Sequence, residues 1–171
     1  IAIEGSRILE VGSLENVRRN HPRHPLKTFP DAALLPGLVN VHSHLELTVL
    51  RGYLEGLDFW RWIRTLTRTK YEVLNEDDIL TSALLGAIEA VQAGVTTVAD
   101  PMDIGVSLDA VLATGLRGVL YQEVFSPKPE EAEQALESLK KKMVLLESRL
   151  AHWPEESRLQ ASVLDGPGAI P

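Results

Sequence analysis

The chain has 171 residues, a formal net charge of −7, no cysteine and an ordinary apolar content. This length can bury one good core but is short for two full domains, and the negative charge argues against a general nucleic-acid binder. The missing cysteines exclude disulfides and thiolate metal sites, and without a membrane-spanning window or a signal-like start we expect a cytoplasmic protein with no membrane partner.

The N-terminal residues 1–12 are predicted to form a β-hairpin around a turn at residues 4–6, Glu-Gly-Ser. A hairpin alone is barely stable in water, so we expect it to belong to a larger sheet whose other strands lie outside this sequence. Residues 13–30 show little periodicity. Prolines break the polar part of this stretch, and we expect its histidines, His21 and His24, to be exposed to solvent.

An apolar strand that leaves a Pro-Gly turn, residues 36–46, carries His42 and His44. Side chains alternate along a strand, so these two imidazoles point the same way while Ser43 points opposite. Two imidazoles on one side of a strand end supply half of a metal site. A pair of surface histidines is the usual meaning of an isolated His-x-His, but the apolar strand before the pair and the acidic Glu46 after it favour a metal.

The segment after this strand, residues 47–57, is punctuated by glycine and is expected to be irregular. A helix is predicted to follow, with Asp58 as its N-cap. Aromatic residues gather at its start, and side chains such as Trp60 are placed to wall a pocket for a flat ring.

A longer helix is predicted from Asn75, its N-cap, to Gly94, its C-terminal stop. Its expected apolar stripe consists of Leu80, Leu84, Ala87, Ile88 and Val91. A β-branched strand at 95–99 follows directly and ends in Asp100.

The same order of helix, glycine and strand then repeats. A shorter helix is predicted at 106–114, a strand at 118–122, a long helix opened by Ser126, and a last strand at 159–164. Strands that alternate with helices indicate a parallel sheet in an α/β fold, either an open doubly wound sheet or a β/α barrel. No glycine-rich phosphate loop follows any strand.

The C-terminal ends of parallel strands meet at one edge of the sheet, where β/α barrels place their chemistry. In this sequence those ends carry two imidazoles and three carboxylates: His42, His44, Asp100, Glu123 and Asp165. Each acid alone would more often cap a helix or anchor a loop. Together with the histidines they predict a hydrolytic metal site.

The stretch Pro-Gly-Leu-Val-Asn-Val-His-Ser-His at 36–44 resembles the first-strand motif of the amidohydrolase superfamily, in its cytosine deaminase and chlorohydrolase-like branch. Further similar segments occur in the family's order, at residues 3–12, 51–62 and 93–100. The segments 45–48 and 121–125 resemble aminodeoxyfutalosine deaminases.

The resemblance implies a (β/α)8 barrel preceded by a small β-sandwich, with residues 1–35 in the sandwich and residues 36–171 forming about the first four βα units of the barrel. It also implies one divalent metal, zinc or iron, held by His42 and His44 together with a later histidine and aspartate. The metal would activate water to attack an electron-poor ring carbon and release ammonia or halide. The expected activity is hydrolytic deamination of an adenosine-like nucleoside or nucleobase.

No catalytic acid or base follows from the motif, and the pocket is expected to be lined by Asp100, Glu123 and Trp60. A small-molecule substrate is the expected partner, and a homo-oligomer is left open. A phosphoesterase of the polymerase and histidinol phosphatase type also begins with His-x-His, but it usually has small polar and acidic residues where this chain has Leu45-Glu46-Leu47.

The sequence also departs from the family pattern. Only four of eight strands are seen, residues 165–171 lack the family's Pro-His segment, and His152 lies at the wrong end of a βα unit to replace that ligand. We therefore expect the N-terminal half of an enzyme or a truncated product. The alternative function is a non-catalytic fragment or a binding module with an incomplete metal site. For the chain as given we expect weak zinc binding at most.

Overall fold

A computed structural model describes residues 1–126, 128–153 and 161–164. The chain forms two compact units, Ile1–Pro36 and Gly37–Pro171. The division falls one residue after the predicted boundary between 35 and 36. The assignment of the first unit to a β-sandwich and of the second to half a barrel stays a prediction at this point.

In the first unit, strands β1 (Ala2–Glu4) and β2 (Arg7–Glu10) pair antiparallel, with Glu4 opposite Arg7, around a turn in which Gly5 has φ 56°. The predicted hairpin is confirmed. Helix α1 (Leu14–Asn20) was not predicted, because its seven residues bury only one apolar side chain and show no stripe. Its local signal is the N-cap Ser13, whose hydroxyl accepts a hydrogen bond from the Asn16 amide at 3.3 Å.

The expected exposure of both N-terminal histidines is wrong for His21. Its ring is only partly exposed, and Nε2 lies 3.0 Å from Oε2 of Glu10. This contact draws the residue after α1 against β2. His24 is exposed as predicted.

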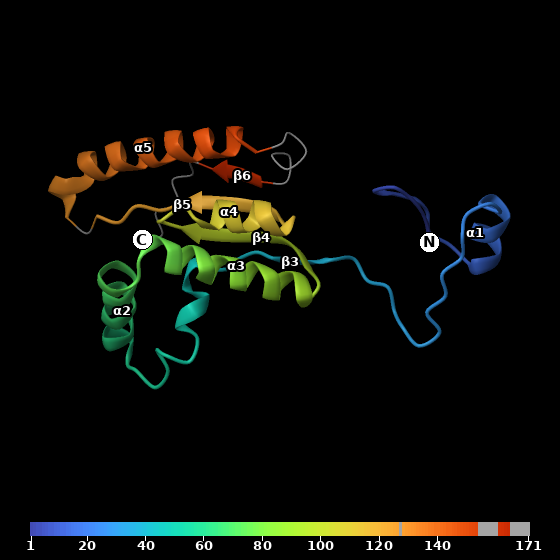
Figure 1. The fold of residues 1–171 in the computed structure, drawn as a ribbon, viewed down its shortest axis with the longest axis horizontal. Helices are drawn as coiled ribbons and strands as arrows, with labels where there is room; N and C mark the ends of the chain where they lie inside the picture. The colour runs from blue at the N-terminus through green and yellow to red at the C-terminus, as the bar shows by residue number, and fades with distance from the viewer. Residues whose placement is uncertain (127, 154–160, 165–171) are drawn as a thin grey trace. The chain divides into compact units, whose positions relative to one another are not determined.

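The second unit contains a four-stranded parallel sheet in the order β3-β4-β5-β6 (Figure 1). Its strands are β3 (Leu38–Asn40), β4 (Val95–Met102), β5 (Arg117–Gln122) and β6 (Ala161–Leu164). Helices separate consecutive strands: α2 (Phe59–Arg68) and α3 (Glu76–Gln92), then α4 (Ser107–Thr114), then α5 (Ala132–Ala151). The predicted parallel α/β alternation is confirmed.

Local capping chemistry fixes several helix ends as predicted. The Asp58 carboxylate accepts a hydrogen bond from the Arg61 amide at 3.0 Å and starts α2. Asn75 and Asp78 form a reciprocal capping box at the start of α3. Gly115, with φ 73°, ends α4 in the left-handed conformation.

Other boundaries differ from the prediction. The segment expected to be irregular includes a 3₁₀ helix, η1 (Leu45–Leu50), and α2 continues into a π-helical turn, η2 (Thr69–Val73). The long helix starts after a short 3₁₀ turn, η3 (Pro129–Glu131), rather than at Ser126. Strand β4 runs two residues past Asp100, so this residue lies within the strand and not at its end.

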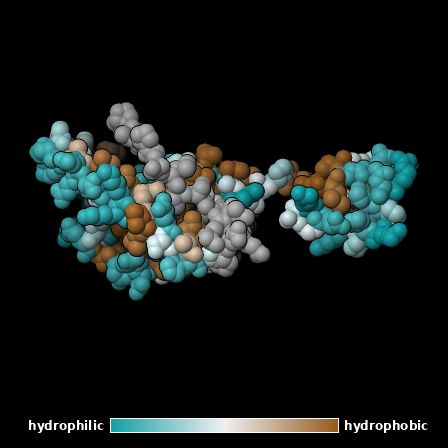
Figure 2. All heavy atoms as spheres, turned by 90° about the horizontal axis from the view of Figure 1, so that it is seen from above, coloured by the Kyte–Doolittle hydropathy of each residue, from teal (hydrophilic) through white to brown (hydrophobic). Residues whose placement is uncertain are grey.

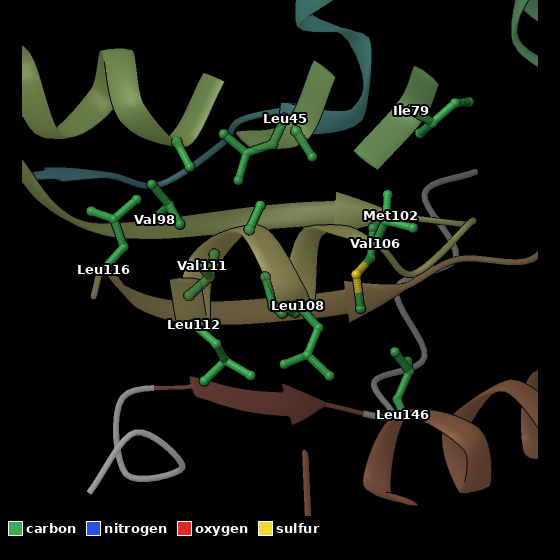
Figure 3. Close-up of a cluster of buried hydrophobic side chains, with 14 residues drawn as sticks. Leu45, Ile79, Val98, Met102, Val106, Leu108, Val111, Leu112, Leu116 and Leu146 are labelled. Carbon is green, nitrogen blue, oxygen red and sulfur yellow. The ribbon is translucent and has the colours of Figure 1, made fainter. Parts of the chain in front are cut away.

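The core of the second unit gathers around β4 and α4. Val98 and Met102 of β4, Leu108 of α4 and Leu120 of β5 are almost fully buried. Figure 3 shows side chains of η1, α3, β4, α4 and α5 converging on this cluster. The core therefore lies directly against the strands whose ends carry the predicted site.

The predicted stripe of helix α3 is confirmed in part. Ala87 is fully buried, and Leu80 and Leu84 pack against the core. Ile88 and Val91 are instead 45% and 46% exposed, and the small residue Ala83 is fully buried beside Ala87. The small face lets α3 approach η1 closely. An ideal Cβ on Gly86 would lie 2.3 Å from Thr48 Oγ1, so only glycine fits this contact without a shift.

Gly86→Ala is therefore expected to destabilise the chain by about 1–3 kcal/mol through overpacking, although alanine is better than glycine in a helix by about 1 kcal/mol. Adding Thr48→Ala removes the obstructing hydroxyl and should recover most of the loss. Urea unfolding of the two single variants and the double variant measures this coupling. A Gly86→Ala chain that is more stable than wild type would contradict the close packing.

Apolar side chains remain on the surface as well as in the core (Figure 2). They include Leu38 and Val39 on the edge strand β3, which are 57% and 61% exposed. Among the described residues no helix is both long enough and apolar enough to cross a membrane.

Candidate functional site

His42 and His44 lie just beyond β3, which ends at Asn40, at the C-terminal edge of the sheet, and not on the strand that was predicted to carry them. Their rings are 4.9 Å apart between centroids and nearly perpendicular. His44 Nδ1 donates a hydrogen bond to the carbonyl oxygen of Pro101 at 3.3 Å, because a carbonyl can only accept. Nε2 of His44 then carries the lone pair and has no hydrogen-bond partner among the described residues. Metal-binding histidines usually have this arrangement, in which one ring nitrogen donates to a protein acceptor and the other binds the metal.

Asp100 of β4 contacts the two residues that flank His44. Its side chain is 0% exposed, and Oδ1 accepts hydrogen bonds of 2.8 Å from both the Ser43 hydroxyl and the Leu45 amide. Asp100 is therefore buried against the backbone of the histidine segment and does not stand on a pocket wall, as the sequence led us to expect. The reason is the alternation of side chains along β4, which puts Asp100 on the same buried face as Val98 and Met102.

Burial raises the pKa of the Asp100 carboxyl, and its hydrogen bonds oppose the shift. The other oxygen, Oδ2, has no hydrogen-bond partner among the described residues, and neither does Ser107 Oγ. The Ser107 hydroxyl is close enough to lower the pKa of Asp100, although the pair does not meet hydrogen-bond geometry.

A buried charged cluster that the sequence did not predict adjoins the histidine segment. The Lys70 ammonium of η2 contacts Glu46 Oε2 at 2.9 Å and also bonds to Asp103, which in turn accepts from the Tyr71 hydroxyl. Glu46 accepts a further hydrogen bond from the Gly105 amide at 2.9 Å. The cluster thus ties the residues after His44 to η2 and to the loop after β4.

The charges of this cluster shift one another's titration. Burial favours neutral Lys70, but Glu46 and Asp103 outweigh it and raise the pKa of the ammonium. Burial also opposes ionisation of Asp103, yet Lys70 and Tyr71 hold the pKa of that carboxyl below its usual range. Burial and Asp103 raise the pKa of Tyr71.

These shifts predict the pH dependence of stability. The lowered pKa of Asp103 contributes stability that is present above its unfolded value of about 3.9 and is lost as the pH falls through its folded value. The raised pKa of Lys70 contributes stability that is present below about 10.4 and is lost as the pH rises through its folded value. Urea midpoints measured across pH should show a shallower acid limb for Asp103→Asn than for wild type. Identical acid limbs would refute the assignment.

Glu123 follows β5 and is half-buried near the same edge. Burial raises the pKa of its carboxyl, and the proximity of His44 opposes the shift. The Glu123 amide donates to the Met102 carbonyl at 2.7 Å, which fixes the start of this loop on β4. Glu123 thus lies at the same C-terminal edge of the sheet as His44.

An open pocket of about 340 Å³ begins at His44 and is lined by Leu47, Leu50, Trp62 and Leu66, among others. Trp60 lies two positions before the nearest pocket residue of α2, Trp62, and is 70% exposed. Its ring packs edge-on against Phe59. Trp62, rather than Trp60, is the tryptophan on the pocket wall.

The remaining predicted acid, Asp165, lies outside the described residues. His152 ends α5, with Nδ1 2.6 Å from the Ser148 carbonyl, as its position in the sequence indicated. Within the described parts of the chain no group of three His, Cys, Asp or Glu side chains is arranged to hold a metal. The histidine pair fits half of such a ligand set.

Comparison with known proteins places the chain in a family. The model of the amidohydrolase family matches residues 33–161. The 5-methylthioadenosine/S-adenosylhomocysteine deaminase of Desulfitobacterium hafniense is 32% identical over 133 residues, covering 75% of this chain and 30% of that protein. The 5'-deoxyadenosine deaminase of Methanothrix thermoacetophila is 34% identical, covering 76% of this chain and 31% of that protein.

Two solved structures share the fold. Helicobacter pylori aminofutalosine deaminase, in complex with methylthio-coformycin, has a TM-score of 0.69 at 17% identity and covers 94% of this chain and 37% of its own. Triazine hydrolase from Arthobacter aurescens has a TM-score of 0.57 at 21% identity, covering 75% and 33%.

The chain spans about a third of the length of the curated relatives it matches. The family match nevertheless covers both histidines and most of the parallel sheet. This chain belongs to the amidohydrolase family.

Proposed function

We propose that this chain forms part of a metal-dependent hydrolase that deaminates an adenosine-like nucleoside. The observation that carries the proposal is the His42 and His44 pair at the C-terminal edge of a parallel sheet, with His44 Nδ1 engaged and Nε2 free. The relatives are named as deaminases of 5-methylthioadenosine, S-adenosylhomocysteine and 5'-deoxyadenosine, which supports the substrate class.

The parallel sheet is proposed to be the first four βα units of a (β/α)8 barrel, and the N-terminal hairpin part of a β-sandwich. Two observations support the first proposal. Strand β3 has a neighbour on only one side in the described sheet, and a closed barrel would pair its other edge. Its apolar residues Leu38 and Val39 are exposed, and the rest of a barrel would cover them.

One divalent ion, zinc or iron, is proposed to bind His42 and His44. Imidazole suits either metal, and the Pro101 contact leaves His44 Nε2 as the donor. When bound, such an ion would activate water for attack on an electron-poor ring carbon. The two imidazoles supply only half of a usual ligand set, so tight binding needs further groups.

The substrate is proposed to lie between the histidine pair and the pocket at η1 and α2. Glu123 is proposed to face the substrate, since its raised pKa and its place near His44 suit a group that holds a proton. Trp60 stays a proposed substrate contact, and Trp62 on the pocket wall is placed to contact a flat ring. The cytoplasmic location and the homo-oligomer remain predictions.

The competing proposal is a non-catalytic fragment or a binding module with an incomplete metal site. The absence of a three-residue ligand group among the described residues favours it for this chain taken alone. The two proposals differ in whether the product of the whole reading frame turns over substrate.

The decisive experiment is an ammonia-release assay on that product with bound metal measured in parallel. The panel contains adenosine, 5'-deoxyadenosine, 5-methylthioadenosine and S-adenosylhomocysteine, with cytosine and a chlorotriazine to represent the cytosine deaminases and chlorohydrolases of the same branch. We expect ammonia from at least one adenosine compound. Chloride release from the triazine alone would replace the proposed substrate class, and a metal-loaded protein that is inactive on every compound would establish the non-catalytic alternative.

A further inference from the structure

We propose that Asp100 is a positioning residue that holds the segment around His44 and thereby selects the imidazole tautomer whose Nε2 is free. The proposal deepens the proposed function and rests on it for the role of the metal. The observation behind it is that one buried carboxylate oxygen, Oδ1, accepts hydrogen bonds from the residues on both sides of His44, Ser43 and Leu45.

Three consecutive residues of β4 contact three consecutive residues of the histidine segment. The Ala99 carbonyl accepts from the Ser43 amide at 2.9 Å, Asp100 accepts from Ser43 and Leu45, and the Pro101 carbonyl accepts from His44 Nδ1 at 3.3 Å. Regular pairing between β3 and β4 has ended at Asn40, opposite Val98. Asp100 therefore continues the connection between these strands where the backbone ladder no longer does.

An acceptor at this position must serve two donors in a site closed to water. A carboxylate oxygen can accept both, since it is an acceptor only and has more than one lone pair. A buried carboxylate with an unpartnered second oxygen is costly, and Oδ2 has no partner among the described residues. Local costs of this kind are characteristic of residues that serve a site.

The consequence for His44 follows from the fixed distance to Pro101. While Ser43 and Leu45 are held, Nδ1 stays within reach of the carbonyl and keeps its proton, so Nε2 presents its lone pair. Asp100 is buried and would act only through the histidine segment. It is therefore proposed to orient a ligand and not to touch the substrate.

The test is long-range ¹H–¹⁵N NMR of the imidazoles in the full 171-residue chain without metal, at mildly alkaline pH. Wild type should show protonated Nδ1 and unprotonated Nε2 on His44. Asp100→Ala should shift His44 toward the Nε2-protonated form that predominates in free histidine. Asp100→Asn should retain the wild-type form, since its amide oxygen can accept the same two bonds and its NH₂ can donate to Ser107.

Ser43→Ala provides a milder variant in case Asp100→Ala does not fold, and it should give a mixture of both forms. Asp109→Ala, which removes the partner of Arg149 away from the histidines, controls for destabilisation alone and should leave the tautomer unchanged. A folded Asp100→Ala or Ser43→Ala chain with the wild-type His44 tautomer would overturn the proposal.

The role toward the metal is tested separately by zinc titration of the protein encoded by the whole reading frame, called the whole-frame product below. Loss of such an orienting partner typically costs about 10–100-fold in metal affinity, so Asp100→Ala should show a loss of this size and Asp100→Asn should restore most of it. The NMR result does not depend on metal or turnover. A tautomer change without any zinc binding would uphold the positioning and reject the proposed function.

Discussion

Lys70→Met is expected to lower the free energy of unfolding by about 3–5 kcal/mol, because it leaves two buried carboxylates without their shared cation. The ammonium contacts Glu46 at 2.9 Å and also pairs with Asp103, and all three side chains are buried. Methionine is unbranched and only one heavy atom shorter than lysine, so the loss reports mainly the missing charge. Chemical unfolding followed by circular dichroism measures it.

Arg68→Met is the matched control on the same helical segment. Arg68 forms an exposed i,i+4 pair with Glu72, with Nε and Oε2 3.3 Å apart, and such pairs contribute about 0.3–0.5 kcal/mol. Adding Asp103→Asn to Lys70→Met removes one of the stranded charges and should recover part of the loss. Equal effects of Lys70→Met and Arg68→Met would show that the cluster does not hold η2 in place.

The helix starts could be predicted from the sequence because they depend on contacts between neighbouring residues. Asp58 and Asn75 each start a helix by accepting a hydrogen bond from an amide three residues later, so the signal and its effect are neighbours in the sequence. The proximity of the two histidine rings was also predicted from the sequence, although β3 ends at Asn40 and the pair lies beyond the strand that was expected to carry it. The family match then followed from the same stretch.

The charged cluster could not be predicted in that way. Lys70 lies 24 residues from Glu46 and 33 from Asp103. Each is a charged residue of a type that is usually exposed to solvent, so nothing in the sequence marks the three as a buried group. Two members of the predicted α3 stripe, Ile88 and Val91, are exposed for a related reason. Larger apolar residues such as Ile88 suggested the buried side, but the contact with η1 selects small residues, which hydrophobic spacing does not rank.

Asp100 shows that the position of a residue along a strand does not by itself fix the direction of its side chain. The sequence placed an acid near the end of β4, beside the histidines, and the structure agrees. Which way such an acid points depends on the phase of side-chain alternation along the strand, and here Asp100 shares the buried face of Val98 and Met102.

His44→Ala and His42→Ala are each expected to lower the zinc affinity of the whole-frame product by more than about 100-fold. Loss of a residue that only orients a metal ligand already lowers metal affinity by about 10–100-fold. Removal of the ligand itself should therefore lower it by more. Deaminase activity should fall with the bound metal. Competition with a chromophoric chelator measures the affinity, and elemental analysis measures the stoichiometry.

Two histidines outside the pair serve as controls. His24→Ala and His152→Ala remove an exposed ring and a helix-end ring, and neither should change the zinc affinity. The 171-residue chain alone should bind zinc only weakly, because two imidazoles leave half of a tetrahedral shell to water. Tight one-to-one zinc in that chain would mean that the ligand set is complete without further residues. Wild-type zinc affinity in His44→Ala would mean that the metal lies elsewhere, and the orientation of His44 by Pro101 would then need another purpose.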